Sequence, residues 1–222
     1  GSTFTDVTAS LRLGYWVRVK AAQTVTNPSV GFKVTTSGDV IAVDYCQCES
    51  NTIPTSPVLS VTAQGARQAD NINIATLTPW FNEAAGSIYL DALSSDGVQV
   101  VNQFGCHFDD TTANERTVVY RSTARAGIAI TTDGAVTQAN PTVGTWNDLT
   151  VGKAAYGYLL NDFGYTLNGA TIATDVAGTI PTPTNFKIGV SQANTSHWNG
   201  HIRRILFWNR RLTNPYLVSL TT

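Results

Sequence analysis

Aromatic side chains next to planar amides and carboxylates are the residues of this sequence whose types favour ligand binding. An exposed aromatic ring can cover the apolar face of a sugar, and amides or carboxylates can hydrogen-bond to its hydroxyls. The first candidates are Trp146, Asn147 and Asp148, which are consecutive in an expected loop. Trp80, Tyr120 and Asn194 are further candidates of the same kinds. Packing in a core is the alternative for each aromatic residue.

An acidic loop offers a different chemistry, because carboxylate and amide oxygens are the ligands that Ca²⁺ takes. Residues 108–115 contain four such side chains: Asp109, Asp110, Asn114 and Glu115. Their spacing is not that of a dedicated calcium loop. The favoured interpretation is therefore a solvated turn without a cofactor, with calcium as the alternative.

Catalysis on glycans needs two carboxyl groups, about 5 Å apart or a little more, that face one cleft. On a β-strand such groups would alternate along the sequence, and no such run of acids occurs here. Asp91 is the only acid on the strand that resembles the right place, with Glu83 before it. The histidines lie in no nucleophile motif. We therefore expect that the protein is not an enzyme, and a glycan depolymerase is the less favoured alternative.

The composition limits which partners the surface can bind. Of the 222 residues 13% are charged, and the formal net charge is -1, whereas about 25% is usual for soluble domains. The balance of charges predicts no binding to a nucleic-acid backbone or an anionic membrane. No stretch reaches the roughly 18 apolar residues that span a bilayer. Recognition should therefore depend on hydrogen bonding and stacking.

The strands that must position these residues are predicted by alternating apolar and polar residues, rich in Thr, Val, Ile and Tyr. In the N-terminal part they are expected at residues 15–20, 30–35 and 39–49. About ten more follow, at residues 71–77, 86–93, 98–104, 116–121, 127–132, 150–160, 162–167, 170–175, 186–190 and 201–208. Many short strands with turns between them favour an antiparallel two-sheet jelly-roll sandwich, an all-β fold.

Turn and cap residues refine this expectation. Asn168-Gly169 predicts a type I′ hairpin because both residues tolerate positive φ, and Asp133-Gly134 predicts a second hairpin. A single helix is expected at the C-terminus, with Pro215 in its first turn and with Leu217 and Leu220 docked on the sandwich.

Three motifs resemble the concanavalin A-like (laminin-G-like) jelly-roll domain, in the form found at the C-terminal end of tailed-bacteriophage virion proteins. They are Gly86-Ser87-Ile88-Tyr89-Leu90-Asp91-Ala92, Leu167-Asn168-Gly169, and residues 199–213 with the sequence NGHIRRILFWNRRLT. The resemblance covers roughly residues 66–222, and the closing motif is its most specific part.

The beginning of the chain resembles part of a carbohydrate-binding-module-like sandwich. Cys46-Gln47-Cys48-Glu49 with Pro54-Thr55-Ser56 is similar to the end of such a module, and residues 14–19 are similar to an earlier strand. The predicted organisation is a partial β-sandwich at 1–50, a Pro-, Ser- and Thr-rich linker at 51–69 and the jelly roll at 70–222. Other residues or another subunit would complete the first sandwich.

The resemblance implies a phage-like virion protein, a fibre or spike component whose lectin-like domain binds host-surface or environmental glycans. A purely structural decoration, cement or head-fibre protein without glycan binding is the alternative. The implied partners are further copies of the chain, as a trimer, other virion proteins and a cell-surface polysaccharide. The implied location is the virion surface, after synthesis in the host cytoplasm.

Overall fold

The computed structural model describes residues 4–21, 24, 26, 30–48, 70–94 and 101–222. The chain divides into two compact units, residues 1–67 and residues 68–222. The predicted linker at 51–69 lies outside the described residues. Each unit is described by itself.

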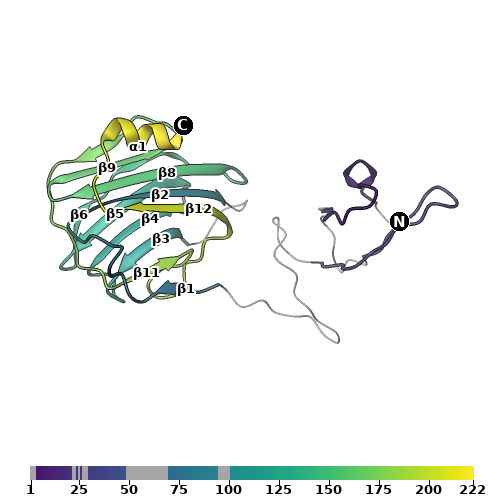
Figure 1. Ribbon diagram of the computed structural model, residues 1–222, viewed down its shortest axis with the longest axis horizontal. Coiled ribbons are helices and arrows are strands. Elements are labelled where there is room, and N and C mark those ends of the chain that lie inside the picture. The colour runs from purple at the N-terminus through teal and green to yellow at the C-terminus, as the bar shows by residue number, and fades with distance from the viewer. Residues whose placement is uncertain (1–3, 22–23, 25, 27–29, 49–69, 95–100) are drawn as a thin grey trace. The chain divides into compact units, whose positions relative to one another are not determined.

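In the second unit two antiparallel sheets pack face to face (Figure 1). The seven-stranded sheet runs, in spatial order, through β1 (Ile72–Ile74), β11 (Asn185–Ile188), β3 (Gln103–Asp109), β4 (Arg116–Arg121), β5 (Ala126–Asp133) and β6 (Val136–Ala139), and β7 (Thr142–Thr145) also pairs with β5. The five-stranded sheet runs through β10 (Ala173–Asp175), β9 (Asp162–Leu167), β8 (Val151–Leu159), β2 (Ala85–Ser94) and β12 (Gly200–Trp208). The expected all-β fold of two antiparallel sheets is confirmed.

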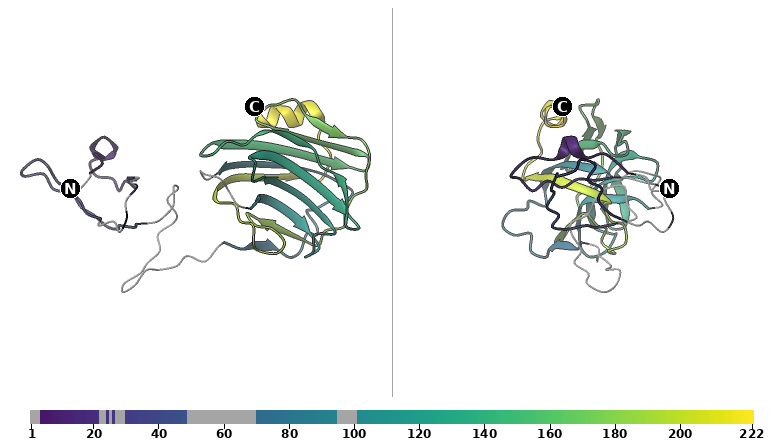
Figure 2. Two further views of the ribbon diagram at one scale, coloured as in Figure 1. Left: turned by 180° about the vertical axis from the view of Figure 1, so that it is seen from behind. Right: turned by 90° about the vertical axis from the view of Figure 1, so that its right-hand side faces the viewer.

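The core lies between the two sheets, which Figure 2 shows from behind. Along β2 the side chains of Ile88, Leu90 and Ala92 are buried in this core, because successive residues of a strand point to opposite faces. Aromatic rings fill one region, where Phe81 stacks between Phe108 and Phe207 at centroid distances of 4.9 and 5.3 Å. Burial of apolar area at about 25 cal/mol per Å² holds the sheets together.

Both hairpins and the helix form where the sequence predicts them. Asn168 and Gly169 have φ of 51° and 70°, as a type I′ turn requires, and the second hairpin joins β5 to β6 through Gly134. Helix α1 (Asn214–Thr221) begins with Pro215 in its first turn and buries Leu217 completely. It lies beside β8 and β9 of the five-stranded sheet (Figure 1). No helix among the described residues has the length and apolar character to cross a membrane.

The first unit differs from the expectation of a three-stranded block. Its described residues contain a 3-10 helix, η1 (Thr8–Ser10), and no strand, so the strands predicted at 15–20, 30–35 and 39–48 are absent there. None of those residues is buried, and Leu13, Trp16 and Val40 are largely exposed. Without a buried face or neighbouring strands, alternation alone does not stabilise a sheet. The assignment of 1–50 to a partial sandwich stays a prediction.

We predict that Gly152→Ala destabilises the sandwich by about 1–3 kcal/mol or more, the usual cost of overpacking a core. A Cβ at this position would collide with the indole of Trp146, a fully buried ring. Urea denaturation followed by tryptophan fluorescence measures the change. Gly31→Ala is the control, because a Cβ there meets nothing within 4 Å. Equal transition midpoints for the two variants would contradict the prediction.

Candidate functional site

The outer face of the seven-stranded sheet, which points away from the five-stranded sheet, carries an uncommon mixture of side chains. The register of four strands aligns them in three rows. A polar row holds Asn185, Asp109, Arg116 and Thr132, a middle row holds Lys187, His107, Val118 and Ile130, and a third row holds Phe104, Tyr120 and Ile128. These residues are called the outer-face surface below. Its apolar members form a cluster separate from the core.

The third row forms an aromatic platform. The ring of Phe104 stacks on Tyr120 at 5.1 Å and on His107 at 5.2 Å between centroids. A β-bulge between Phe104 and Cys106 brings Phe104 and His107 to the same face although they are three residues apart. Phe104 and Tyr120 are 8% and 7% exposed, so only a small part of each side chain reaches solvent. The Tyr120 hydroxyl makes no hydrogen bond to the described residues and is not a fully buried atom, so it is open to a ligand.

The polar and middle rows include a pair of buried titratable groups. His107 and Asp109 are both 0% exposed, and 3.7 Å separates His107 Nε2 from Asp109 Oδ2. Neither imidazole nitrogen, nor Asp109 Oδ2, has a hydrogen-bond partner among the described residues. Burial, helped by the positive charges of Arg116 and Lys187, lowers the pKa of His107 to about 3. The imidazole is therefore neutral near neutral pH.

Only one oxygen of the Asp109 carboxyl group, Oδ1, accepts hydrogen bonds from the described residues. Its Oδ1 accepts hydrogen bonds from Asn185 Nδ2 at 2.5 Å and from the Thr111 amide at 2.7 Å. Burial raises the pKa of this carboxyl group. Buried polar atoms are usually partnered, so the unpartnered Oδ2 beside the two free imidazole nitrogens marks this region as unusual.

Two cations flank the buried pair. Half-buried Arg116 donates from Nε to Thr132 Oγ1 at 3.3 Å, and burial lowers the pKa of its guanidinium. Lys187 Nζ donates to the Gln192 carbonyl at 2.8 Å and to Asn194 Oδ1 at 2.9 Å. Within the described part of the chain neither cation forms an ion pair. The charge of Lys187 acts on the nearby carboxyl group of Asp109, whereas no carboxylate of the described residues lies within ion-pair distance of the Arg116 guanidinium.

Two of the predicted sugar-binding residues belong to this region. Tyr120 is part of the aromatic platform, and Asn194 borders the surface through its bond to Lys187. The sequence analysis missed Phe104, His107 and Arg116. The sequence signal that could have identified them is the alternation along β3 and β4, but the predicted strand 98–104 ended where β3 begins, and the bulge interrupts the period.

The other predicted residues lie elsewhere and require a correction. Trp146 is 0% exposed and packs edge-on against Trp198 at 4.9 Å, so its ring cannot stack on a sugar. Trp80 packs against the aromatic core, 5.5 Å from Phe207. The ring of Trp146 therefore serves the sandwich interior, which is the packing alternative stated above, whereas Trp80 is partly exposed and its assignment stays a prediction.

Asp148 contacts β4 and the turn that follows it, and the Asn147 backbone contacts β2, while Asn147 itself is exposed and its assignment to a sugar stays a prediction. Asp148 forms ion pairs with Arg121 and with Arg125, the latter at 2.6 Å, and the hydrogen bond from Arg125 lowers the pKa of Asp148. The Asn147 carbonyl accepts a bond from Ser94 Oγ at 2.7 Å. These contacts fasten the loop to the end of the sandwich.

The carboxylates of the acidic loop accept hydrogen bonds from backbone amides, and Asp109 is buried, so it is not part of a solvated turn. The bonds are Thr111 N to Asp109 at 2.7 Å, Thr112 N to Asp110 at 2.9 Å and Gly134 N to Glu115 at 2.7 Å. Asn114 accepts from the Ala135 amide through its carbonyl at 3.1 Å. Among the described residues no three His, Cys, Asp or Glu side chains gather as a metal site would require.

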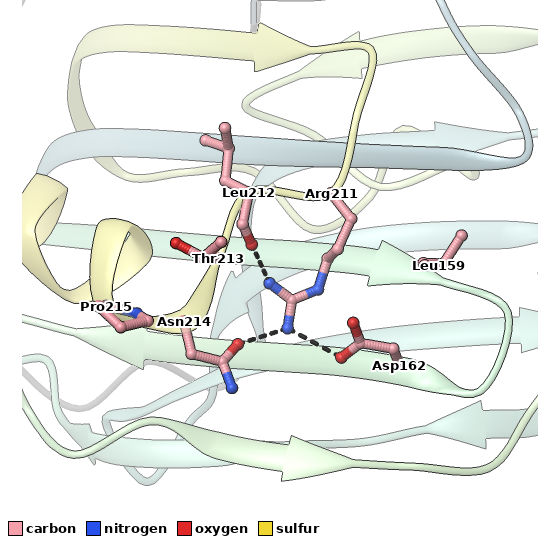
Figure 3. Close-up of a pocket in the computed structure, with 7 residues that line it drawn as sticks. All are labelled: Leu159, Asp162, Arg211, Leu212, Thr213, Asn214 and Pro215. Atoms are coloured by element: carbon pink, nitrogen blue, oxygen red, sulfur yellow. Dashed lines mark hydrogen bonds and ion pairs between the residues drawn. The ribbon is translucent and has the colours of Figure 1, made fainter.

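A hollow of about 460 Å³ lies between α1 and the five-stranded sheet (Figure 3). Arg211 fills its centre, donating to Asp162 at 3.0 Å, to Asn214 at 2.5 Å and to the Leu212 carbonyl. A Cβ on Gly157 or Gly164 would lie within 2.8 Å of this side chain. Because the guanidinium is committed to three partners, Arg211 anchors the C-terminal segment on the sheet.

Comparison with known proteins identifies the fold of the chain but assigns it to no family. No protein-family model and no curated sequence matches the chain. Among solved structures, the Ruminococcus gnavus IT-sialidase CBM40 bound to alpha2,3 sialyllactose is similar, with a TM-score of 0.53, 16% identity and coverage of 64% of this chain and 84% of that one.

Whole sialidases contain a similar part. The NanB sialidase of Streptococcus pneumoniae has a TM-score of 0.56 at 10% identity, over 69% of this chain and 27% of that chain. The leech intramolecular trans-sialidase has 0.51 at 17% identity, over 68% and 27%. At such identities the likeness concerns the fold, and it confirms the predicted jelly-roll sandwich. It does not connect the chain with phages.

The buried histidine makes a prediction about pH. The pKa of His107 is about 3 in the folded protein against an ordinary 6.5, so between these values only the unfolded chain binds its proton. Its contribution to stability should be present above pH 6.5 and be lost as the pH falls towards 3, because protons stabilise the state that binds more of them.

The measurement is the free energy of unfolding of the wild type minus that of His107→Gln, at several pH values. This difference should rise with pH up to about 6.5 and then stay constant. His201→Gln is the control, because His201 is exposed on β12. A pH-independent difference for His107→Gln would refute the assignment.

Proposed function

We propose that the sandwich is a lectin-like module that binds glycans on the outer-face surface. The observation that carries the proposal is the Phe104–Tyr120 platform beside two donors that lack partners among the described residues, the Tyr120 hydroxyl and the terminal nitrogens of Arg116. Sugars present both an apolar ring face and many hydroxyls, so they match such a mixed surface. The partly exposed Ile128 and Ile130 extend the apolar side.

The similarity to CBM40 supports this proposal. That protein is a carbohydrate-binding module whose solved complex contains sialyllactose. The sandwich is a fold that hosts many functions. The proposal therefore depends on the side chains of this chain and uses the fold only as support.

We further propose binding without hydrolysis. Asp109 is the carboxylate of the outer-face surface, and its Oδ1 is committed to Asn185. Asp91 points outward from the five-stranded sheet and lies 3.6 Å from Arg203. Two carboxylates on opposite sides of a sandwich cannot flank one glycosidic bond.

This module would act in adhesion, as part of a phage-like fibre or spike that is exposed on the virion. The support is the closing motif of residues 199–213. Several copies, as in a trimer, would strengthen weak single sites through multivalency. Light scattering tests this, since a monomer in solution would contradict the fibre assignment.

A structural role without sugar binding is the second candidate. Large apolar residues of the first unit, among them Leu13, Tyr15 and Trp16, are exposed, and exposed apolar surface favours contacts with other chains. A glycan array with the intact protein separates the two candidates. Silence across host polysaccharides would favour the structural role, and new reducing ends after incubation would show hydrolysis.

We predict that Tyr120→Phe weakens glycan binding roughly tenfold, the effect of one lost hydrogen bond of about 1 kcal/mol or slightly more. The substitution keeps the stacking on Phe104 and removes only the free hydroxyl. Isothermal titration with the best array ligand measures it. Tyr216→Phe, on the exposed side of α1, is the control. Unchanged affinity for Tyr120→Phe would place the ligand away from this surface.

A further inference from the structure

We propose that the outer-face surface selects acidic sugars, and that Arg116 binds their carboxylate group. This inference rests on the proposed function and adds the chemical class of the ligand.

The first argument is the state of the Arg116 guanidinium. It sits at the start of β4, half-buried, beside Asp109 in the polar row. Its only hydrogen bond to the described residues is the one from Nε to Thr132 Oγ1, at 3.3 Å. The N–H groups of its two terminal nitrogens are therefore available to donate to both oxygens of a ligand carboxylate, which is the bidentate geometry that arginine favours.

The second argument is the charge balance around this guanidinium. Lys187 adds a second cation, and both cations act on the imidazole of His107. Neither forms an ion pair within the described part of the chain. The buried carboxyl group of Asp109 faces Asn185 and the Thr111 amide. Because no carboxylate of the described residues pairs with the Arg116 guanidinium, an anionic ligand would form that ion pair.

The third argument concerns the uncharged imidazole of His107 and the aromatic platform beside it. His107 is fully buried with both nitrogens unpartnered, and it stacks on Phe104 of the platform. The charge of Arg116 acts on the hydroxyl of Tyr120, so the guanidinium extends from the polar row towards the third row. A ring-shaped ligand that lies against Tyr120 and the partly exposed Ile128 would therefore bring a substituent to the guanidinium. A sugar ring with one carboxylate has this arrangement of groups.

The experiment compares matched ligands that differ only in charge. Oligogalacturonate, hyaluronan oligosaccharide and sialyllactose are each titrated into the whole chain beside their methyl esters, at low and at high salt. We expect at least one acid to bind tenfold or more tightly than its ester. The preference should shrink at high salt, because partly exposed charges are screened.

Variants then assign the preference to a residue. Arg116→Gln should abolish it, so that acid and ester bind equally, since the ester lacks the charge that the guanidinium binds. Arg116→Lys should retain part of the preference, because lysine keeps the charge without the fork. Arg204→Gln makes the same charge change on β12 of the other sheet and should have no effect. Melting curves confirm that each variant is folded.

The outcomes separate this inference from the proposed function. Equal binding of acid and ester would overturn the inference and leave glycan binding intact. Binding of no glycan, acidic or neutral, would overturn both. Tighter binding of heparin than of every carboxylated probe would identify a sulfate site and overturn the assignment to a carboxylate. A preference that survives Arg116→Gln would exclude Arg116 as its source.

Discussion

The packing of two sheets against one apolar interior is the constraint on which the rest of the structure depends. Ile88, Leu90 and Phe108 meet in that interior, and Trp146 closes one end where Gly152 leaves room for its indole. Burial of this area offsets the conformational entropy lost on folding. Because the interior holds the strands in register, residues distant in sequence become neighbours on the opposite, outer face.

That register accounts for the chemistry of the outer-face surface. His107 and Asp109 lie two apart on β3 and therefore share a face. Neither would be buried without partners in an isolated strand, since the desolvation of such groups is unfavourable. The stability of the core allows the sheet to keep His107 and Asp109 buried beside Lys187 and Arg116. Sites that combine buried, perturbed titratable groups with charge are typical of functional surfaces.

Local patterns predicted much of the fold. Asn168-Gly169 forms its hairpin because the backbone conformation is a property of those two residues. Helix α1 follows from Pro215 and the burial of Leu217. The predicted strands of the first unit did not form, because no described side chain there is buried, and alternation stabilises a strand only when one face is covered.

The sequence by itself determined an all-β chain, its principal hairpin and C-terminal helix, and a weakly charged surface. Whether an aromatic residue points inward or outward was decided by the tertiary structure alone. Trp146 and Tyr120 looked alike as candidates, yet one is sealed in the core and the other lies on the outer face. The reason is physical: Trp146 occupies the space that Gly152 leaves in the core, whereas Tyr120 follows the core residue Val119 on β4 and so points to the opposite face. The pairing of β3, β4 and β11 then brings Arg116, His107 and Lys187 together.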